Sequence, residues 1–207
     1  MIKIPKEKFY IVGDYHINHS NLVKGTSSWE DKSSCRDFTT LKEMEDLFVE
    51  NTNKVVPKDG FLIINGDILF GNKDYLPTFL SRINCEWKTL NFGNHDDWLR
   101  KRTEFHPLFK GGVQDYLEVA VGKRLVCIFH YSQKIWRDAH HGSYHLFSHS
   151  HGSMPFDENS LSIDVGIDLV YENHLQYHPF SFNEIDHIMK NCKGKPVFLD
   201  HHNEKTT

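Results

Sequence analysis

Cysteine is scarce in this chain, and the spacing of its cysteines excludes several familiar kinds of site. The 207 residues contain four cysteines and no Cys-x-x-Cys pair, so the sequence offers neither a thiolate zinc site nor a thioredoxin-type redox motif. Scattered cysteines in a chain without an export signal are expected to be reduced, structural thiols. They are Cys35, Cys85, Cys127 and Cys192.

Long apolar runs and a strong excess of one charge are also missing. No stretch approaches the roughly 18 apolar residues of a membrane span, and the first residues lack the apolar segment of a signal peptide. We therefore expect a cytoplasmic protein with no membrane partner. The 24 Lys and Arg against 28 Asp and Glu, a net charge of −4 and a pI of about 6.4 argue against a protein that coats duplex DNA or anionic lipid.

Histidine, in contrast, is abundant. The chain contains 15 histidines in 207 residues, several times the usual share. Imidazole is the commonest metal ligand among side chains. Composition alone therefore points towards metal chemistry.

Apolar, β-branched runs alternate with segments of helical period, which predicts an α/β fold. With no internal repeat or linker, we expect a single domain over residues 1–190 and a tail over 191–207, in which His201 and His202 are solvated and not ligands. Beyond residue 116 strand follows strand, which favours mixed sheets. The expected strands are Phe9–Val12, Phe61–Ile64, Thr89–Phe92, Tyr116–Val121, Leu125–Phe129, Tyr144–Phe147 and Leu161–Val165.

Two helices have clear start signals. Each signal is a Ser or Thr followed three residues later by Glu, the pattern of a capping box, with apolar residues at helical spacing behind it. The two boxes are Thr40–Glu43 and Ser181–Glu184. A third helix is expected over Asp96–Phe109, ending near Pro107.

Asp, Asn or His follows five of the expected strands. In open α/β sheets, ligands bind outside the carboxyl ends of strands. Any one of these residues alone would be read as a turn former or helix cap. The ordered set (Asp-x-His, Gly-Asp, Gly-Asn-His-Asp, a lone His, His-x-His) is far more specific, because chance would have to supply all five pieces in sequence. The possible donors are Asp14, His16, Asp67, Asn94, His130, His149 and His151.

This order of motifs resembles the calcineurin-like metallophosphoesterases, and most of all the small branch without a cap domain in bacteria and their phages. The resemblance runs from about Phe9 to Ile188 and includes Phe38–Met44, His130–Trp136 and Val165–Asp168. It implies a four-layer α-β-β-α sandwich with two mixed β-sheets. For a phage-encoded member, the implied location is the host cytoplasm.

The resemblance also implies a binuclear metal centre. By matching motif position, Asp14, His16 and His151 would hold one metal, Asn94, His130 and His149 would hold the other, and Asp67 would bridge them. Carboxylates with several imidazoles suit Mn, Fe, Co, Ni or Zn better than Mg or Ca, so two divalent transition ions are expected, Mn first among them. Such a pair can generate hydroxide near neutral pH and stabilise in-line displacement at phosphorus.

Residues beside these motifs are candidates for catalysis or substrate binding. His95 follows Asn94 directly, and the family comparison makes it the group that protonates the departing oxygen or stabilises its charge. Asp96 could orient that imidazole or cap a helix. His19 and Asn21 match a His-x-Asn feature of the same branch, and would either contact substrate phosphate or tie the loop down.

Three positions depart from the wider family. The protein-phosphatase branch follows its bridging Asp with a further Asp and an Arg-Gly pair, whereas Asp67 is followed by Ile-Leu-Phe-Gly, which counts against a phosphoprotein phosphatase. Ser148 stands where Gly is usual before His-x-His, a small change that should leave the ligands in place. Asp164 replaces the Asn expected before Val165.

The leading hypothesis is a metal-dependent phosphoesterase that cleaves a small phosphodiester or phosphomonoester, with a nucleotide-like substrate favoured, by attack of a bridging hydroxide with His95 assisting the leaving group. A nuclease on DNA or RNA is the alternative, but the chain lacks a basic strip with interleaved aromatics; its longest basic run, Arg100–Arg102, is expected to be an exposed helix face. A non-catalytic protein-binding scaffold of the same fold is a third possibility, although such members usually lose His95 or a ligand.

Overall fold

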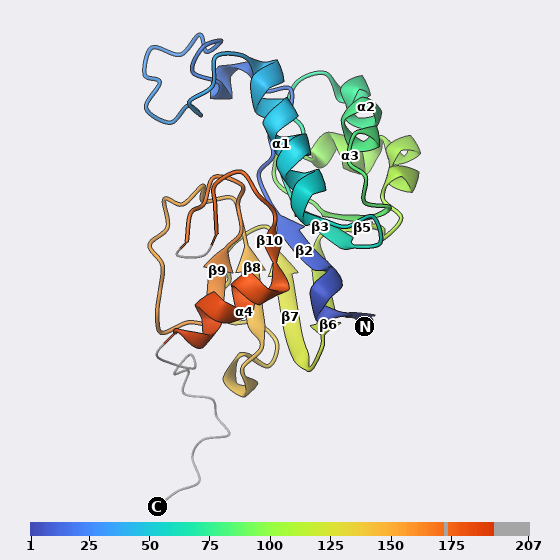
Figure 1. The fold of residues 1–207 in the computed structure, drawn as a ribbon, viewed down its shortest axis with the longest axis vertical. Helices are drawn as coiled ribbons and strands as arrows, with labels where there is room; N and C mark the ends of the chain where they lie inside the picture. The colour runs from blue at the N-terminus through green and yellow to red at the C-terminus, as the bar shows by residue number, and fades with distance from the viewer. Residues whose placement is uncertain (172–173, 193–207) are drawn as a thin grey trace, which may run out of the picture.

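Two mixed five-stranded sheets form the centre of the computed structural model, which describes residues 1–171 and 174–192 (Figure 1). In chain order the strands are β1 (Ile2–Ile4), β2 (Phe9–Val12), β3 (Phe61–Asn65), β4 (Trp87–Asn91), β5 (Val113–Gln114), β6 (Tyr116–Val121), β7 (Arg124–Phe129), β8 (Tyr144–Phe147), β9 (Ser162–Asp164) and β10 (Phe180–Ser181). One sheet has the order β10-β2-β3-β4-β5 and the other β1-β6-β7-β8-β9. Only β10–β2 and β6–β7 pair antiparallel among these strands. The expected α/β class and pair of mixed sheets are confirmed.

All seven strands expected from the sequence are present, with ends shifted by at most two residues. Their apolar runs are long enough to be recognised. The strands that were not expected, β1, β5 and β10, have only two or three residues each. So short a segment shows no alternation of apolar and polar residues by which to recognise it.

Two of the helices begin at the expected caps. The described α-helices are α1 (Leu41–Val55), α2 (Leu76–Ser81), α3 (Asp97–Lys101) and α4 (Phe182–Lys190), and the 3-10 helices are η1 (Lys6–Lys8), η2 (Ser20–Leu22), η3 (Lys73–Tyr75), η4 (Thr103–Leu108) and η5 (Ala139–His141). The Glu43 amide donates to the Thr40 hydroxyl at 3.1 Å at the start of α1. At the start of α4, Ser181 and Glu184 form the complete reciprocal box.

The expected helix over Asp96–Phe109 is wrong in its extent. The chain forms the five-residue α3, leaves helical geometry at Arg102, and continues as η4. Pro107 lies inside η4. Proline has no N–H to donate, and in an α-helix its ring would clash with the carbonyl four residues earlier, so an α-helix cannot continue through this segment.

Helices α1, α2 and α3 cover one face of the β10–β5 sheet (Figure 1). Fully buried Met44 and Phe48 from α1 pack there with Val12, Leu62 and Leu90 from the strands. Each large apolar side chain buried in this way stabilises the fold by about 1.5–3 kcal/mol. This layer fixes the strands whose carboxyl ends carry the first three motifs.

A second apolar cluster lies between the two sheets. It combines Ile11 of β2 with Val126 and Ile128 of β7. Helix α4 joins this cluster through the buried side chains of Phe182 and Ile185. The two sheets and α4 therefore share one core, and the relative position of the sheets depends on it.

Part of the outer face of the β1–β9 sheet is covered by segment 130–143. Cys127 of β7 is buried there against Trp136 and Ala139, and the one helical turn that segment 130–143 contributes is η5. Of the helical layers that a four-layer sandwich requires, α1–α3 form the one on the β10–β5 sheet. On the outer face of the β1–β9 sheet, Trp136 and Ala139 of the irregular segment cover Cys127.

Residues 193–207, which include His201 and His202, lie outside the described part, so the expectation for them is not tested. Across the described residues, no helix combines the length and the apolar character needed to cross a membrane.

His145 of β8 is a buried histidine that belongs to this outer covering. Its Nε2 accepts from the Gln133 amide at 3.0 Å, and its Nδ1 donates to the Cys127 carbonyl at 3.2 Å. Only the neutral ring with its proton on Nδ1 can make both bonds. The Trp136 ring stacks on it at 5.3 Å. Burial lowers the pKa of His145 to about 4.

We predict that His145 reduces the stability of the fold in mild acid. Its pKa is about 6.5 in the unfolded chain and about 4 in the fold, so below pH 6.5 the unfolded state takes up a proton that the fold excludes. As the pH is lowered from about 6.5 to about 4, the free energy of unfolding should decrease by up to about 3 kcal/mol. Urea unfolding followed by circular dichroism should show a weaker pH dependence for His145→Gln than for the wild type. His141→Gln, at an exposed histidine, should keep the wild-type dependence, and equal slopes in both variants would contradict the prediction.

Candidate metal centre

The five motif-bearing loops meet where β2, β3, β4, β7 and β8 end. Two groups of three side chains result, and within each group the ligand atoms all lie within 4.8 Å of one another. The groups are Asp14, His16, His151 and Asp67, His130, His149. Each draws residues from both sheets, so the geometry of the centre depends on the core between the sheets.

The Asp67 carboxylate of the second group also approaches the first group. Its Oδ2 is 3.7 Å from His16 Nε2 and 3.4 Å from His130 Nε2. Asn94, the remaining expected ligand, places its Oδ1 3.2 Å from His130 Nε2. His16 and His151 approach each other to 3.3 Å between their Nε2 atoms. All seven residues expected from the sequence are therefore brought together.

Five of these seven residues adopt left-handed backbone conformations. The angle φ is 57° at Asp14, 48° at His16, 54° at Asp67, 71° at His149 and 47° at His151. Such conformations cost of order 1–3 kcal/mol each outside glycine, and they cluster at functional sites. Hydrogen bonds between the loops hold them, since the Asp14 amide donates to the Gly66 carbonyl at 3.0 Å and the His16 amide to the Asp67 carbonyl at 2.9 Å.

Asp96 fixes the turn that carries Asp67. Its buried carboxylate accepts from the amides of Asp67 at 2.7 Å, Gly93 at 2.9 Å and Ile68 at 3.3 Å. Asp96 is the N-cap residue of α3, one of the two roles considered for it, but its carboxylate makes no capping bond to that helix. The hydrogen-bond partners of the carboxylate are these three amides and not the His95 ring. Burial raises the pKa of Asp96 to about 7, against the effect of the Gly93 amide.

Gly93 allows the turn after β4 to approach the Asp67 carboxylate. A Cβ atom at position 93 would lie 2.2 Å from Asp67 Oδ1. No side chain fits in that space. The next residues of the same turn then reach the centre, with the His95 amide donating to Asp67 Oδ1 at 2.8 Å. Asn94 and His95 are both exposed.

Arg36 and Asp168 support the first group, and sequence reasoning did not identify them as site residues. Arg36 is buried and forms two bonds to the Asp168 carboxylate, at 2.7 and 2.9 Å, and further bonds to the carbonyls of Asp14 at 2.6 Å and Tyr15 at 2.7 Å. Asp168 Oδ2 lies 2.9 Å from His151 Nδ1. Burial alone would raise the pKa of Asp168, but the charge of Arg36 holds it well below its usual range.

Two departures from the family pattern have structural roles. Asp164 accepts from the Gly166 amide at 2.8 Å, the Gly152 amide at 3.2 Å and the Ser150 hydroxyl, so its carboxylate braces the loop of the His-x-His motif. The Ser148 hydroxyl donates to the Asn65 carbonyl at 2.5 Å. With Ser148 at this position, His149 and His151 still lie within the two groups.

The buried carboxylates of the centre have perturbed acidities. Burial raises the pKa of Asp14 to about 7. Burial would do the same for Asp67, but its hydrogen bond to His130 and the charge of that ring lower the Asp67 pKa to about 2. Burial, together with the charge of Arg36, lowers the pKa of His16 to about 2 and keeps this ring neutral, the form in which histidine binds metal.

The donor set fits a pair of divalent transition metals. Within the described part of the chain, Asp14 Oδ1 and His16 Nδ1 are buried polar atoms without a hydrogen-bond partner. Buried polar groups without partners are costly, and a cation beside the Asp14 carboxylate would relieve that cost. Carboxylate oxygens combined with imidazoles are the ligands that these ions favour.

His19 and Asn21 have different surroundings. Asn21 Oδ1 accepts from the amide and the hydroxyl of Ser28 at 3.0 and 2.9 Å, so Asn21 ties its loop down, one of the two roles considered for it. The His19 ring stacks on Phe70 with 4.0 Å between centroids, and stands 6.0 Å from the His16 ring. Burial lowers the pKa of His19.

The longest basic run contributes few free charges. Arg100 pairs with Asp97 and Asp115, and Arg102 pairs with Asp74 and Glu104. Such pairing leaves little positive charge for a nucleic-acid backbone.

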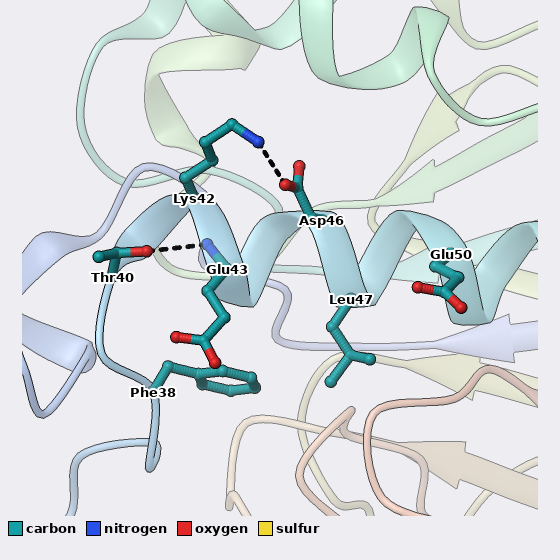
Figure 2. Close-up of a pocket in the computed structure, with 7 residues that line it drawn as sticks. All are labelled: Phe38, Thr40, Lys42, Glu43, Asp46, Leu47 and Glu50. Atoms are coloured by element: carbon teal, nitrogen blue, oxygen red, sulfur yellow. Dashed lines mark hydrogen bonds and ion pairs between the residues drawn. The ribbon is translucent and has the colours of Figure 1, made fainter.

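A separate pocket of about 480 Å³ runs along α1 (Figure 2). Glu43, Asp46 and Glu50 line it with one basic residue, Lys42, which pairs with Asp46. The excess of carboxylates is unsuited to a phosphate. A phosphate group is therefore not expected to bind in this pocket.

Comparisons with known proteins support the fold. No family model matches the chain. The chain is 27% identical over 96 residues to the uncharacterized protein MJ1445 of Methanocaldococcus jannaschii. These residues are 45% of this chain and 49% of MJ1445, so the match spans about half the length of this curated relative. The crystal structure of the protein of unknown function AQ665 from Aquifex aeolicus is similar with a TM-score of 0.57 and 17% identity, over 90% of this chain and 99% of that chain. At that identity the likeness concerns the fold alone.

We predict that Asp168→Asn weakens Mn²⁺ binding by roughly 10- to 100-fold, the usual effect of removing a carboxylate that orients a ligating histidine. The amide leaves the Arg36 charge unpaired and accepts less strongly from His151. Isothermal titration with Mn²⁺ measures the change. Asp186→Asn is the matched control, because this partly buried carboxylate accepts from Tyr144 on another part of the fold. Wild-type affinity in Asp168→Asn would contradict the assignment.

Proposed function

We propose that the chain is a metal-dependent phosphoesterase of the calcineurin-like metallophosphoesterase family, with a binuclear centre and a small, nucleotide-like phosphodiester or phosphomonoester as substrate. The observation that carries the proposal is that the Asp67 carboxylate of the second group also approaches His16 of the first group, with His95 beside them. The motif order along the chain and the two mixed sheets agree with it.

The two groups divide the binding of the metals. Asp14, His16 and His151 would hold one ion, Asn94, His130 and His149 the other, and Asp67 both. Two divalent ions there, with manganese favoured, would activate water and stabilise charge on the reacting phosphoryl group. Four positive charges would face the two negative charges of Asp14 and Asp67. The neutral amide of Asn94 adds none, so the centre keeps a positive charge that attracts an anionic substrate.

In the proposed reaction, His95 would assist the departing oxygen. Its main chain is fixed by the bond from its amide to Asp67, and its ring lies edge-on to the His16 ring with 5.4 Å between centroids. The ring therefore stands beside the first group without belonging to it. A histidine so placed can donate a proton to the leaving oxygen, a step that contributes about 10²- to 10⁴-fold to rate.

The candidate centre is open to solvent through some of its side chains. Asn94, His95, His149 and His151 are exposed, whereas Asp14, Asp67 and His130 lie buried behind them. The substrate would thus meet the centre from the side of the exposed imidazoles. The ion pairs of Arg100 and Arg102 weigh against a nuclease.

We predict that His95→Ala lowers kcat by about 10²- to 10⁴-fold and leaves Mn²⁺ affinity unchanged, because His95 acts on the leaving oxygen and binds no metal. Turnover of a chromogenic diester and a chromogenic monoester by the Mn²⁺-loaded protein measures kcat, and isothermal titration measures the affinity.

His141→Ala is the control for this experiment, since it removes an exposed imidazole from another loop. Its turnover should match the wild type. Absence of turnover by the wild type with every transition metal tried would overturn the proposed function, and full activity in His95→Ala would overturn the role of His95.

A further inference from the structure

Three aromatic rings form a surface next to the candidate metal centre, and we call Phe70, His19 and Trp29 the aromatic shelf. Phe70 and His19 are stacked, with an interplanar angle of 19°, and Trp29 meets His19 edge-on at 5.9 Å. Phe70 is 42% exposed and Trp29 is 40% exposed. His19 covers one face of the Phe70 ring, so a planar partner would stack on the other face.

His95 connects the shelf with the centre. The Phe70 ring meets the His95 ring at 5.2 Å and 67°, and the His95 ring in turn meets the His16 ring at 5.4 Å. In the proposed function His95 assists the departing oxygen, so the shelf would lie on the side from which the leaving group departs.

The main chain around Phe70 is held in place before any ligand binds. The Phe70 amide donates to the Ile17 carbonyl at 3.0 Å, and the Lys73 ammonium donates to the Phe70 carbonyl. Next to it, a Cβ at Gly71 would lie 2.1 Å from Asn18 Oδ1, so only glycine lets this loop pack against the loop after β2. A ring on a fixed backbone loses little entropy when a ligand stacks on it.

We propose that the aromatic shelf binds the heteroaromatic base of a nucleoside leaving group by stacking on Phe70, so that the preferred substrate is a nucleotide whose nucleoside departs beside His95. This inference rests on the proposed function for the identity of the reaction. Stacking is the interaction that exposed aromatic rings offer to bases, and it needs no ionic partner. The Lys73 ammonium stands 5.9 Å from the Phe70 centroid, whereas Arg100 and Arg102 of the longest basic run are ion-paired, which suits one base better than a long polyanion.

The experiment compares substrates that differ only in the base. Adenosine 5′-monophosphate and ribose 5-phosphate share the same ester oxygen, as do their methyl diesters. The Mn²⁺-loaded wild type should prefer the nucleotide by roughly ten-fold or more in kcat/KM, the scale of one stacked base. In Phe70→Leu this preference should fall towards one, and Phe70→Trp should restore it.

Trp87→Leu is the matched control. Trp87 is 43% exposed and stacks on Phe61 at 5.7 Å, but it lies at the start of β4, at the opposite end of the strand from the centre. This variant should keep the wild-type preference. The same loss of preference in Trp87→Leu and Phe70→Leu would overturn the assignment to Phe70.

Binding of adenosine separates this inference from the proposed function. Saturation-transfer NMR on the full chain should show adenosine bound through its base, with a Kd about ten-fold weaker in Phe70→Leu. Base binding without any phosphoester turnover would support the shelf and overturn the proposed function. Turnover with equal kcat/KM for the nucleotide and ribose 5-phosphate would overturn the shelf alone, and so would binding that requires an oligonucleotide.

Discussion

The Asp67 carboxylate faces imidazoles from both halves of the candidate centre, and the turn that carries it constrains everything around it. The backbone of Asp67 is left-handed, and its amide donates to the buried Asp96 carboxylate. Gly93 has no side chain and so leaves room for Asp67 Oδ1. The imidazoles that Asp67 faces come from loops of both sheets. A shift of one sheet against the other would separate them, so the apolar cluster between the sheets controls the site as well as the stability.

Three acids outside the expected ligand set, the buried Asp96 and Asp164 and the partly buried Asp168, support the loops of the candidate centre. Asp96 holds the turn of Asp67, Asp164 holds the loop of the His-x-His motif, and Asp168 holds the ring of His151. Each is satisfied by backbone amides, a hydroxyl or Arg36, as buried charges must be. Loops with strained φ angles can persist only when surroundings over-determine them. These acids supply that support, and this explains why so much negative charge is buried near the centre.

The seven strands and the seven possible ligands could be predicted from the sequence, because apolar runs mark the strands and polar residues directly follow them. The roles of Asp96 and Arg36 could not. Asp96 bonds to amides 28 and 29 residues away, and Arg36 reaches Asp168 across 132 residues, distances at which no local pattern exists. The covering of the β1–β9 sheet was missed for a related reason: Trp136 buries Cys127 from an irregular segment, where neither helical nor strand periodicity applies.

The segment after Asp67 is a further feature whose role in substrate recognition could not be predicted from the sequence. Where the protein-phosphatase branch has a further Asp and an Arg-Gly pair, this chain has Ile-Leu-Phe-Gly, and from the sequence that difference could be read only as a loss. In the fold, Ile68 and Leu69 are buried and fix the loop, while Phe70 remains exposed beside His95. An arginine in this segment would bind a phosphate group whatever organic group the phosphate carries. An apolar ring in this loop instead responds to the organic part of the ester, so selectivity would come from the leaving group and the attraction for phosphate from the metal centre alone.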